Sequence, residues 1–141
     1  MRIKTIKVNW SYPILYENIF LSEKIYEKGI YYLSRKFGNN ETLLYIGKTN
    51  NSFFNRLYCH GDWLSKYRGK ILVRLGIIIS PRNYDDSLIT DIESALIYTL
   101  KPIENTDKKN SYTYYNECKI FNFGYKGVLP SVLSMREQHS F

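Results

Sequence analysis

The chain has 141 residues with a hydrophobic share of 44%, enough for a single domain over residues 1–141 with its own core. Twenty Lys and Arg against thirteen Asp and Glu give a net charge of +7, which favours a polyanionic partner, nucleic acid above all. There is no run of about 18 apolar residues and no apolar stretch typical of a secretory signal, so we expect a cytoplasmic protein with no membrane partner. Cys59 and Cys118 fit no metal-binding spacing and are expected to be free thiols.

The N-terminal part predicts one strand and one helix. Residues 3–10 mix Ile and Val with Lys, as a short strand does. Residues 13–24 place Pro13 in a first turn and apolar side chains on one broad face, which favours a helix.

Two strands joined by a tight turn follow. Residues 30–37 are rich in Tyr, Ile and Leu, and residues 43–48 form a second apolar run. Residues 38–40 between them are Gly-Asn-Asn, which tolerate the backbone angles of a turn. We therefore expect an antiparallel hairpin with a three-residue loop.

The hairpin register brings two tyrosines together. With a three-residue loop, Leu33 lies opposite Tyr45 and Tyr31 lies opposite Gly47. Tyr31 and Tyr45 then share one face as diagonal neighbours, beside the bare backbone of Gly47. A slip of one residue would put the two rings on opposite faces.

A helix is expected next, over residues 52–67, after an N-cap cluster at residues 50–52. Arg56 and His60 are four residues apart and would share one face of this helix. Gly61 is expected to break or kink it.

The second half of the chain predicts a buried strand, a long helix and a docked tail. The apolar residues 70–79 predict a strand covered on both faces, and residues 85–87 can cap a helix that runs to about Leu100. Glu93 would lie at the edge of the buried stripe of this helix. The tyrosine-rich segment after Thr106 would add a strand or two, or an arm, and residues 129–135 would dock as a short helix.

The order strand, turn, strand, helix, strand, helix resembles the GIY-YIG nuclease family. Residues 29–31 match the first motif that names the family, and residues 45–47 match the second one hairpin turn later. Seven side chains then follow the family order: Tyr31, Tyr45, Lys48, Arg56, His60, Glu93 and Asn105. The loop between the two motifs is slightly longer than usual, which a hairpin tolerates.

The resemblance implies an α+β fold with a small central antiparallel or mixed three-stranded sheet flanked by helices, in the order β-β-α-β-α. The catalytic core would be residues 29–105. Residues 1–28 and 106–141 match no known motif and would be extensions of unknown role.

The resemblance also implies a metal-dependent endonuclease that hydrolyses phosphodiester bonds in DNA with a water activated by a tyrosine. Tyr45 would be the general base and Tyr31 would bond the phosphate or the water, or these roles would be exchanged. Tyr45 as a covalent nucleophile is the less favoured alternative. His60 would take the proton from Tyr45 or orient its hydroxyl.

The remaining implied roles concern phosphate and metal. Arg56 offers a planar fork for phosphate oxygens, and Lys48 a point charge. Strand alternation puts Lys48 on the face opposite Tyr45, so its role follows from the resemblance alone. Glu93 would hold Mg²⁺, for which Mn²⁺ can substitute, and a single carboxylate means that the ion arrives largely with the DNA. Asn105 would orient this end of the site.

Two other functions remain open at this point. The first is a nuclease-like module that binds nucleic acid without cutting it, against which the complete set of seven residues argues. The second is an interaction protein whose basic charge is incidental. The sequence leaves open whether the nucleic acid is DNA or RNA and whether its sequence or its structure is recognised. It also leaves open whether a homodimer or a partner subunit is needed for double-strand cleavage.

Overall fold

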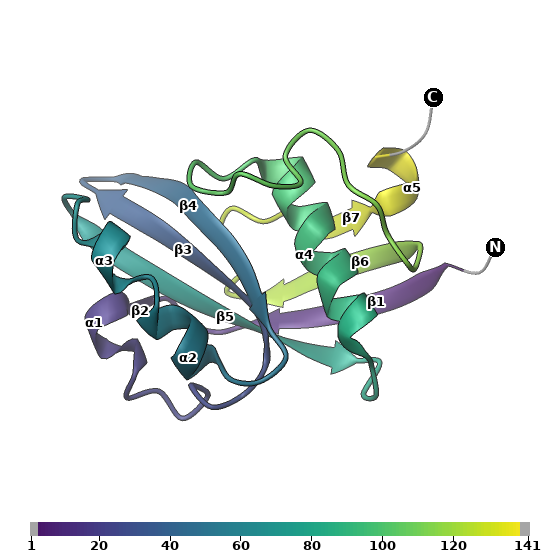
Figure 1. The fold of residues 1–141 in the computed structure, drawn as a ribbon, viewed down its shortest axis with the longest axis horizontal. Coiled ribbons are helices and arrows are strands. Elements are labelled where there is room, and N and C mark those ends of the chain that lie inside the picture. Colours follow the sequence, from purple (N-terminus) through teal and green to yellow (C-terminus); the bar gives the residue numbers. More distant parts are fainter. Residues whose placement is uncertain (1–2, 139–141) are drawn as a thin grey trace.

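The computed structural model describes residues 3–138, and one mixed sheet of seven strands organises them (Figure 1). Six strands follow the order β4-β3-β5-β1-β6-β7, and the short β2 pairs with β5. The strands are β1 (Lys4–Trp10), β2 (Ile14–Leu15), β3 (Gly29–Phe37), β4 (Asn40–Thr49), β5 (Lys70–Ser80), β6 (Cys118–Gly124) and β7 (Val132–Ser134). The helices are α1 (Tyr16–Ile19), α2 (Phe53–Tyr58), α3 (Gly61–Leu64), α4 (Asp86–Leu100) and α5 (Met135–Gln138).

The central strands bury side chains on both faces, because alternate residues point to opposite sides of a sheet. On one face, Tyr31 and Leu33 pack in a core that α2 and α3 close. On the other face, Ile30 and Tyr32 pack against the apolar residues of α4. This confirms the prediction that β5 is covered on both faces, since Val73 and Leu75 lie in the first core and Ile78 in the second.

The α+β class is confirmed, but the predicted three-stranded sheet is too small. β1 pairs antiparallel with β5 and parallel with β6, so both ends of the chain extend the sheet of the central strands. The prediction failed because β5 has two edges. One edge of β5 pairs with β3. The backbone groups of the other edge pair with β2 and β1.

Two terminal segments also differ from prediction for the same reason. Only Tyr16–Ile19 of the expected helix over residues 13–24 is helical, because Ile14 and Leu15 pair with β5 instead. Residues 129–135 were expected to form a short helix, but Val132–Ser134 form β7 against β6, and α5 begins only at Met135. Strand pairing with an open sheet edge overrides local helix preference in both places.

The hairpin register is confirmed where the tyrosines lie and differs at the turn. Tyr31 pairs with Gly47 and Leu33 pairs with Tyr45, as expected. The loop has two residues rather than three, because Phe37 pairs with Asn40, and Gly38 has a φ of 65°. A bulge at Leu44 inserts one extra residue on β4 and restores the predicted pairing.

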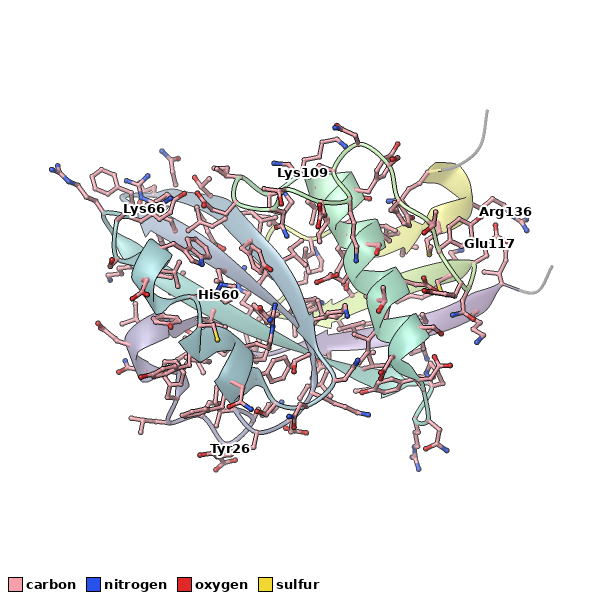
Figure 2. The ribbon with its side chains drawn as sticks, viewed as in Figure 1. Tyr26, His60, Lys66, Lys109, Glu117 and Arg136 are labelled. Carbon is pink, nitrogen blue, oxygen red and sulfur yellow. The ribbon has the colours of Figure 1, made fainter. Side chains whose placement is uncertain are left out.

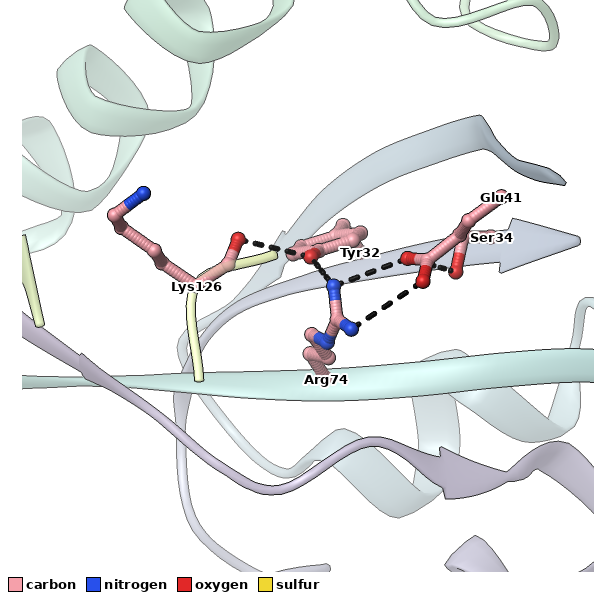
Figure 3. Close-up of polar contacts among 5 residues, drawn as sticks. All are labelled: Tyr32, Ser34, Glu41, Arg74 and Lys126. Atoms are coloured by element: carbon pink, nitrogen blue, oxygen red, sulfur yellow. Dashed lines mark hydrogen bonds and ion pairs between the residues drawn. The ribbon is translucent and has the colours of Figure 1, made fainter. Parts of the chain in front are cut away.

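A buried polar network joins β3, β4 and β5 on the α4 face (Figure 3). The Arg74 guanidinium donates to the Tyr32 hydroxyl and, at 3.0 Å, to Glu41 Oε2. Ser34 Oγ donates to the same carboxylate oxygen at 2.9 Å, and the Tyr32 hydroxyl donates to the Lys126 carbonyl at 2.9 Å. Tyr32 is therefore a structural tyrosine whose hydroxyl is satisfied inside the protein.

Helix α4 forms as its capping residues predict. The Asp85 carboxylate accepts a hydrogen bond from the Leu88 amide at 3.2 Å, and the helix ends at Leu100, with Lys101 in the left-handed conformation before Pro102. Within residues 3–138, every helix is too short or too polar to cross a membrane.

Candidate functional site

The two motif tyrosines lie side by side on the α2 face of the sheet. Their ring centroids are 6.2 Å apart. A Cβ atom at Gly47 would stand 2.3 Å from the Tyr31 hydroxyl oxygen, so the Tyr31 ring lies directly across the bare backbone of Gly47. Tyr31 is completely buried, whereas Tyr45 is half-buried. Of the two phenols, Tyr45 is therefore the one that solvent or a substrate can reach.

The segment that carries Arg56 and His60 forms two short helices rather than one. Helix α2 ends at Tyr58 and α3 begins at Gly61, so the predicted break occurs there, and His60 occupies the junction (Figure 2). The first amides of α2 donate to backbone carbonyls of the segment between α1 and β3, from Phe53 to Glu27 at 2.9 Å and from Phe54 to Ile25 at 2.8 Å. These two bonds satisfy the first free amides of α2, a role that was expected of the N-cap cluster. The Ser52 side chain makes no capping hydrogen bond.

His60 contacts both tyrosines and bonds to one of them. Its Nε2 lies 2.8 Å from the Tyr31 hydroxyl oxygen, and its Nδ1 accepts a hydrogen bond from the Trp63 indole at 2.9 Å. With Tyr45 it makes a ring contact, with centroids 4.7 Å apart. The expected hydrogen-bond partner was Tyr45, and the structure pairs the imidazole with Tyr31 instead. Burial and the charge of Arg56 lower the pKa of His60 to about 4, so the ring is neutral at neutral pH.

Arg56 is exposed on α2 and acts on both phenols. Burial raises the pKa of Tyr31 above its ordinary value, and the nearby Arg56 charge and hydrogen bond oppose this rise. The pKa of Tyr45 is also raised, first by burial and next by the charge of Glu93, while Arg56 lowers it. Both tyrosines are therefore protonated at neutral pH in the free protein.

Glu93 approaches Tyr45 from the side of β4 that α4 covers. It lies on α4, is only 8% exposed, and lines a cavity of about 160 Å³ together with Tyr45, Asn105 and Lys108. Lys108 Nζ lies 2.9 Å from Glu93 Oε1. Because β4 is the outer strand of the sheet, the cavity lies along the edge where residues from both faces meet.

Asn105 holds the loop after α4 against this edge. Its Oδ1 accepts from the Ile46 amide at 2.9 Å, and its Nδ2 donates to the Ile46 carbonyl at 3.0 Å. The Glu104 amide adds a bond to the Leu44 carbonyl at 2.8 Å. The Asn105 side chain thus pairs with β4 as a neighbouring strand would, and it fixes the loop that carries Lys108.

Lys48 lies away from the two tyrosines. It pairs with Ile30, and strand alternation directs its side chain to the face opposite Tyr45 and Gly47. The structure therefore brings together Tyr31, Tyr45, Arg56, His60 and Glu93, with Asn105 beside them, and leaves Lys48 on the opposite face of β4.

Sequence reasoning missed two residues of the site, Trp63 and Lys108. Trp63 stands three residues after His60, a spacing that puts two side chains on one helical face, and this was the available signal. Lys108 follows Asn105 by three residues in a loop of irregular structure, and no periodicity in the sequence links it to Glu93.

A metal ion fits this site only in part. Glu93 offers a carboxylate, but Lys108 already pairs with it at 2.9 Å, so a metal ion would have to share this carboxylate with the lysine or displace it. In the described part of the chain, no three His, Cys, Asp or Glu side chains lie close enough together to hold a metal ion. Mg²⁺ at such a site would take most of its ligands from water and substrate phosphate, as it commonly does.

Comparison with models of protein families, with curated proteins and with solved structures finds no match to this chain.

Proposed function

We propose that this protein is a divalent-metal-dependent endonuclease of the GIY-YIG type that hydrolyses phosphodiester bonds in DNA. The observation that carries the proposal is a convergence of side chains. Tyr31 from β3, Tyr45 from β4, Arg56 from α2, His60 from the α2–α3 junction and Glu93 from α4 surround one edge of the sheet. These are five of the seven residues that the motif order singles out.

Tyr45 is the general base in this proposal. It is the more accessible phenol, and the charge of Arg56 beside it favours the phenolate that would take a proton from water. Tyr31 is fully buried, so it supports the site from behind and does not touch the phosphate. The exposure of the two rings thus favours one of the two arrangements that the motifs leave open.

Arg56 binds the scissile phosphate. Its guanidinium is exposed and next to both phenols, so two of its N–H groups can hold phosphate oxygens while charge develops there. Glu93 would hold Mg²⁺ or Mn²⁺, and the bound ion would supply charge stabilisation for the leaving oxygen. Asn105 positions the loop at this end through its bonds to Ile46.

Lys48 has a lesser role. Because it points from β4 to the face opposite the tyrosines, it adds to the positive surface over which DNA would lie without contacting the scissile phosphate. The net charge of +7 suits the same polyanionic partner.

The experiment is incubation of the protein with supercoiled plasmid, branched DNA, single-stranded DNA and RNA, each with Mg²⁺, with Mn²⁺ and with a chelator. We expect the protein to cleave DNA when Mg²⁺ or Mn²⁺ is present and not when the chelator is present. Salt-sensitive binding to DNA without cleavage of any substrate would support the binding module instead, and binding that is indifferent to salt would support the interaction protein.

A further inference from the structure

We infer that Trp63 fixes the tautomer of His60, so that His60 donates a hydrogen bond to the buried Tyr31 and cannot accept its proton. The protonation pattern of His60 follows from the structure alone, and its consequence for cleavage rests on the proposed function.

The indole N–H of Trp63 faces the imidazole of His60. An indole N–H is a hydrogen-bond donor and never an acceptor. Trp63 Nε1 lies 2.9 Å from His60 Nδ1, so Nδ1 must offer its lone pair and cannot carry a proton. A neutral imidazole has one N–H, and in His60 that proton is therefore on Nε2.

The other ring nitrogen of His60 contacts Tyr31. His60 Nε2 lies 2.8 Å from the Tyr31 hydroxyl oxygen. Since Nε2 carries the proton, the imidazole donates and the phenol oxygen accepts. The hydrogen of the Tyr31 hydroxyl must then point away from His60, and His60 has no lone pair left with which to receive it.

The hydrogen bond that His60 donates acts on the charge and the position of Tyr31. A hydrogen bond to the phenol oxygen stabilises negative charge on Tyr31, as the Arg56 guanidinium does beside it. It also holds the Tyr31 ring over Gly47, next to Tyr45. Neither tyrosine passes its proton to His60, because Nδ1 accepts from Trp63 and Nε2 already carries a proton, and the Tyr45 and His60 rings pack tilted at 54°. Trp63 is thus a positioning residue that acts through His60.

The groups around His60 agree with a neutral ring. Arg56, from α2, is the charged group that acts on it, and it opposes a second proton. Protonation at Nδ1 would also set an N–H against the indole N–H of Trp63. Tyr31 and Tyr45, from β3 and β4, are the titratable groups that contact the ring.

The test is nuclear magnetic resonance of protein labelled with ¹⁵N in its Trp and His side chains, at neutral pH and without DNA. We expect His60 to show the pattern of an imidazole protonated at Nε2, with a scalar coupling across the hydrogen bond from Trp63 Nε1 to His60 Nδ1. Signals that vanish in His60→Gln identify this ring against His139, the second histidine of the sequence. A proton on Nδ1, or no coupling to Trp63 in a spectrum that resolves both nitrogens, would overturn the inference.

Two variants extend the test. Trp63→Phe removes the donor and keeps an aromatic ring, so a population protonated at Nδ1 should appear. Trp10→Phe is the matched control. Trp10 is the other tryptophan of the sequence, its indole donates to Asn122, and it lies in the core on the α4 face of the sheet. An unchanged His60 pattern in a folded Trp63→Phe would contradict the inference. If Trp63→Phe fails to fold, the coupling in the unaltered protein decides alone.

Cleavage provides a separate readout. In Trp63→Phe we expect the turnover number to fall by roughly tenfold to a hundredfold with KM nearly constant, because a positioning bond is lost while phosphate contacts remain. If the unaltered protein proves to cleave no substrate, the proposed function fails while the tautomer measurement still stands or falls by itself. Turnover unchanged in a variant whose tautomer has shifted would contradict the catalytic consequence.

Discussion

Lys108 Nζ and Glu93 Oε1 lie 2.9 Å apart, so a lysine from the loop after α4 holds the carboxylate that the proposed function assigns to the metal ion. The two side chains are 28% and 11% exposed, so the pair is only partly screened by water. A cation that binds Glu93 must therefore share this carboxylate with Lys108 or displace it.

We predict that Lys108→Met increases the affinity of the protein for Mn²⁺. Removing a positive charge a few ångströms from a divalent cation is worth about 2 kcal/mol in a water-like dielectric, or about thirtyfold in the dissociation constant. Isothermal titration calorimetry without DNA measures this directly. Lys119→Met on β6 is the control and should leave Mn²⁺ binding unchanged. Weaker binding by Lys108→Met would mean that the lysine helps to form the metal site.

Gly47→Ala is expected to disturb the site and the core together. The new Cβ atom would stand 2.3 Å from the Tyr31 hydroxyl oxygen and 2.4 Å from Cζ, so the ring must move and its bond to His60 must break. Overpacking of this kind costs about 1–3 kcal/mol of unfolding free energy, measurable by urea denaturation. Gly61→Ala is the control, since its Cβ would meet nothing closer than the Tyr16 hydroxyl at 3.4 Å. Equal stability of the two variants would contradict the placement of Tyr31.

The hairpin shows how far the sequence predicts this site. Strand alternation and the opposition of Tyr31 to Gly47 followed from the spacing of two apolar runs, and both are confirmed. The predicted loop was one residue too long, and the bulge at Leu44 compensates for the difference, so the register at the tyrosines was right for a partly wrong reason. The alternation of apolar and polar residues predicts which face of the sheet a side chain lies on. It does not predict a bulge that shifts the strand pairing by one residue.

What the sequence does not predict are contacts between segments of irregular structure. Lys108 meets Glu93 because Asn105 holds its loop to Ile46, and no pattern in the sequence contains that pairing. A strand over residues 3–10 and a strand or two after Thr106 were predicted, but their pairing within the central sheet was not, since it forms by joining open sheet edges. Such edges exist only after the central strands have been arranged in space.

His60 should make the stability of the protein depend on pH between about 4 and 6.5. Its pKa is lowered to about 4 in the folded protein, against about 6.5 in an unfolded chain, so between these values the unfolded state binds the extra proton. The contribution of neutral His60 to the free energy of unfolding is therefore fully present above about pH 6.5. It is lost as pH falls to about 4, and the total loss is about 3 kcal/mol.

Urea denaturation of the unaltered protein and of His60→Gln, each at pH 7, 6, 5 and 4, separates this contribution from that of the carboxylates. The difference between the two unfolding free energies should shrink by about 3 kcal/mol on acidification. A difference that stays constant with pH would mean that His60 is protonated in the folded state as readily as in the unfolded one.

The rate of cleavage should rise with pH if Tyr45 is the base. Burial and the charge of Glu93 raise the pKa of this phenol, so only a small fraction is ionised at neutral pH. Each unit of pH then increases that fraction about tenfold, and the rate should climb between pH 7 and 9 without a plateau. Single-turnover cleavage at saturating metal measures the profile. A plateau near pH 7 would assign the proton transfer to another group.

In the proposed function, Tyr45 and Glu93 cut DNA that the rest of the surface binds. The most direct test compares Tyr45→Phe and Glu93→Gln with the controls Tyr125→Phe and Glu23→Gln, two exposed positions away from the site. Cleavage of supercoiled plasmid in Mg²⁺ and binding to a short duplex are measured for each. We expect both site variants to lose cleavage by at least about a hundredfold and to keep DNA affinity within a few-fold, while the controls cut normally. Full cleavage by both site variants would contradict the proposed function.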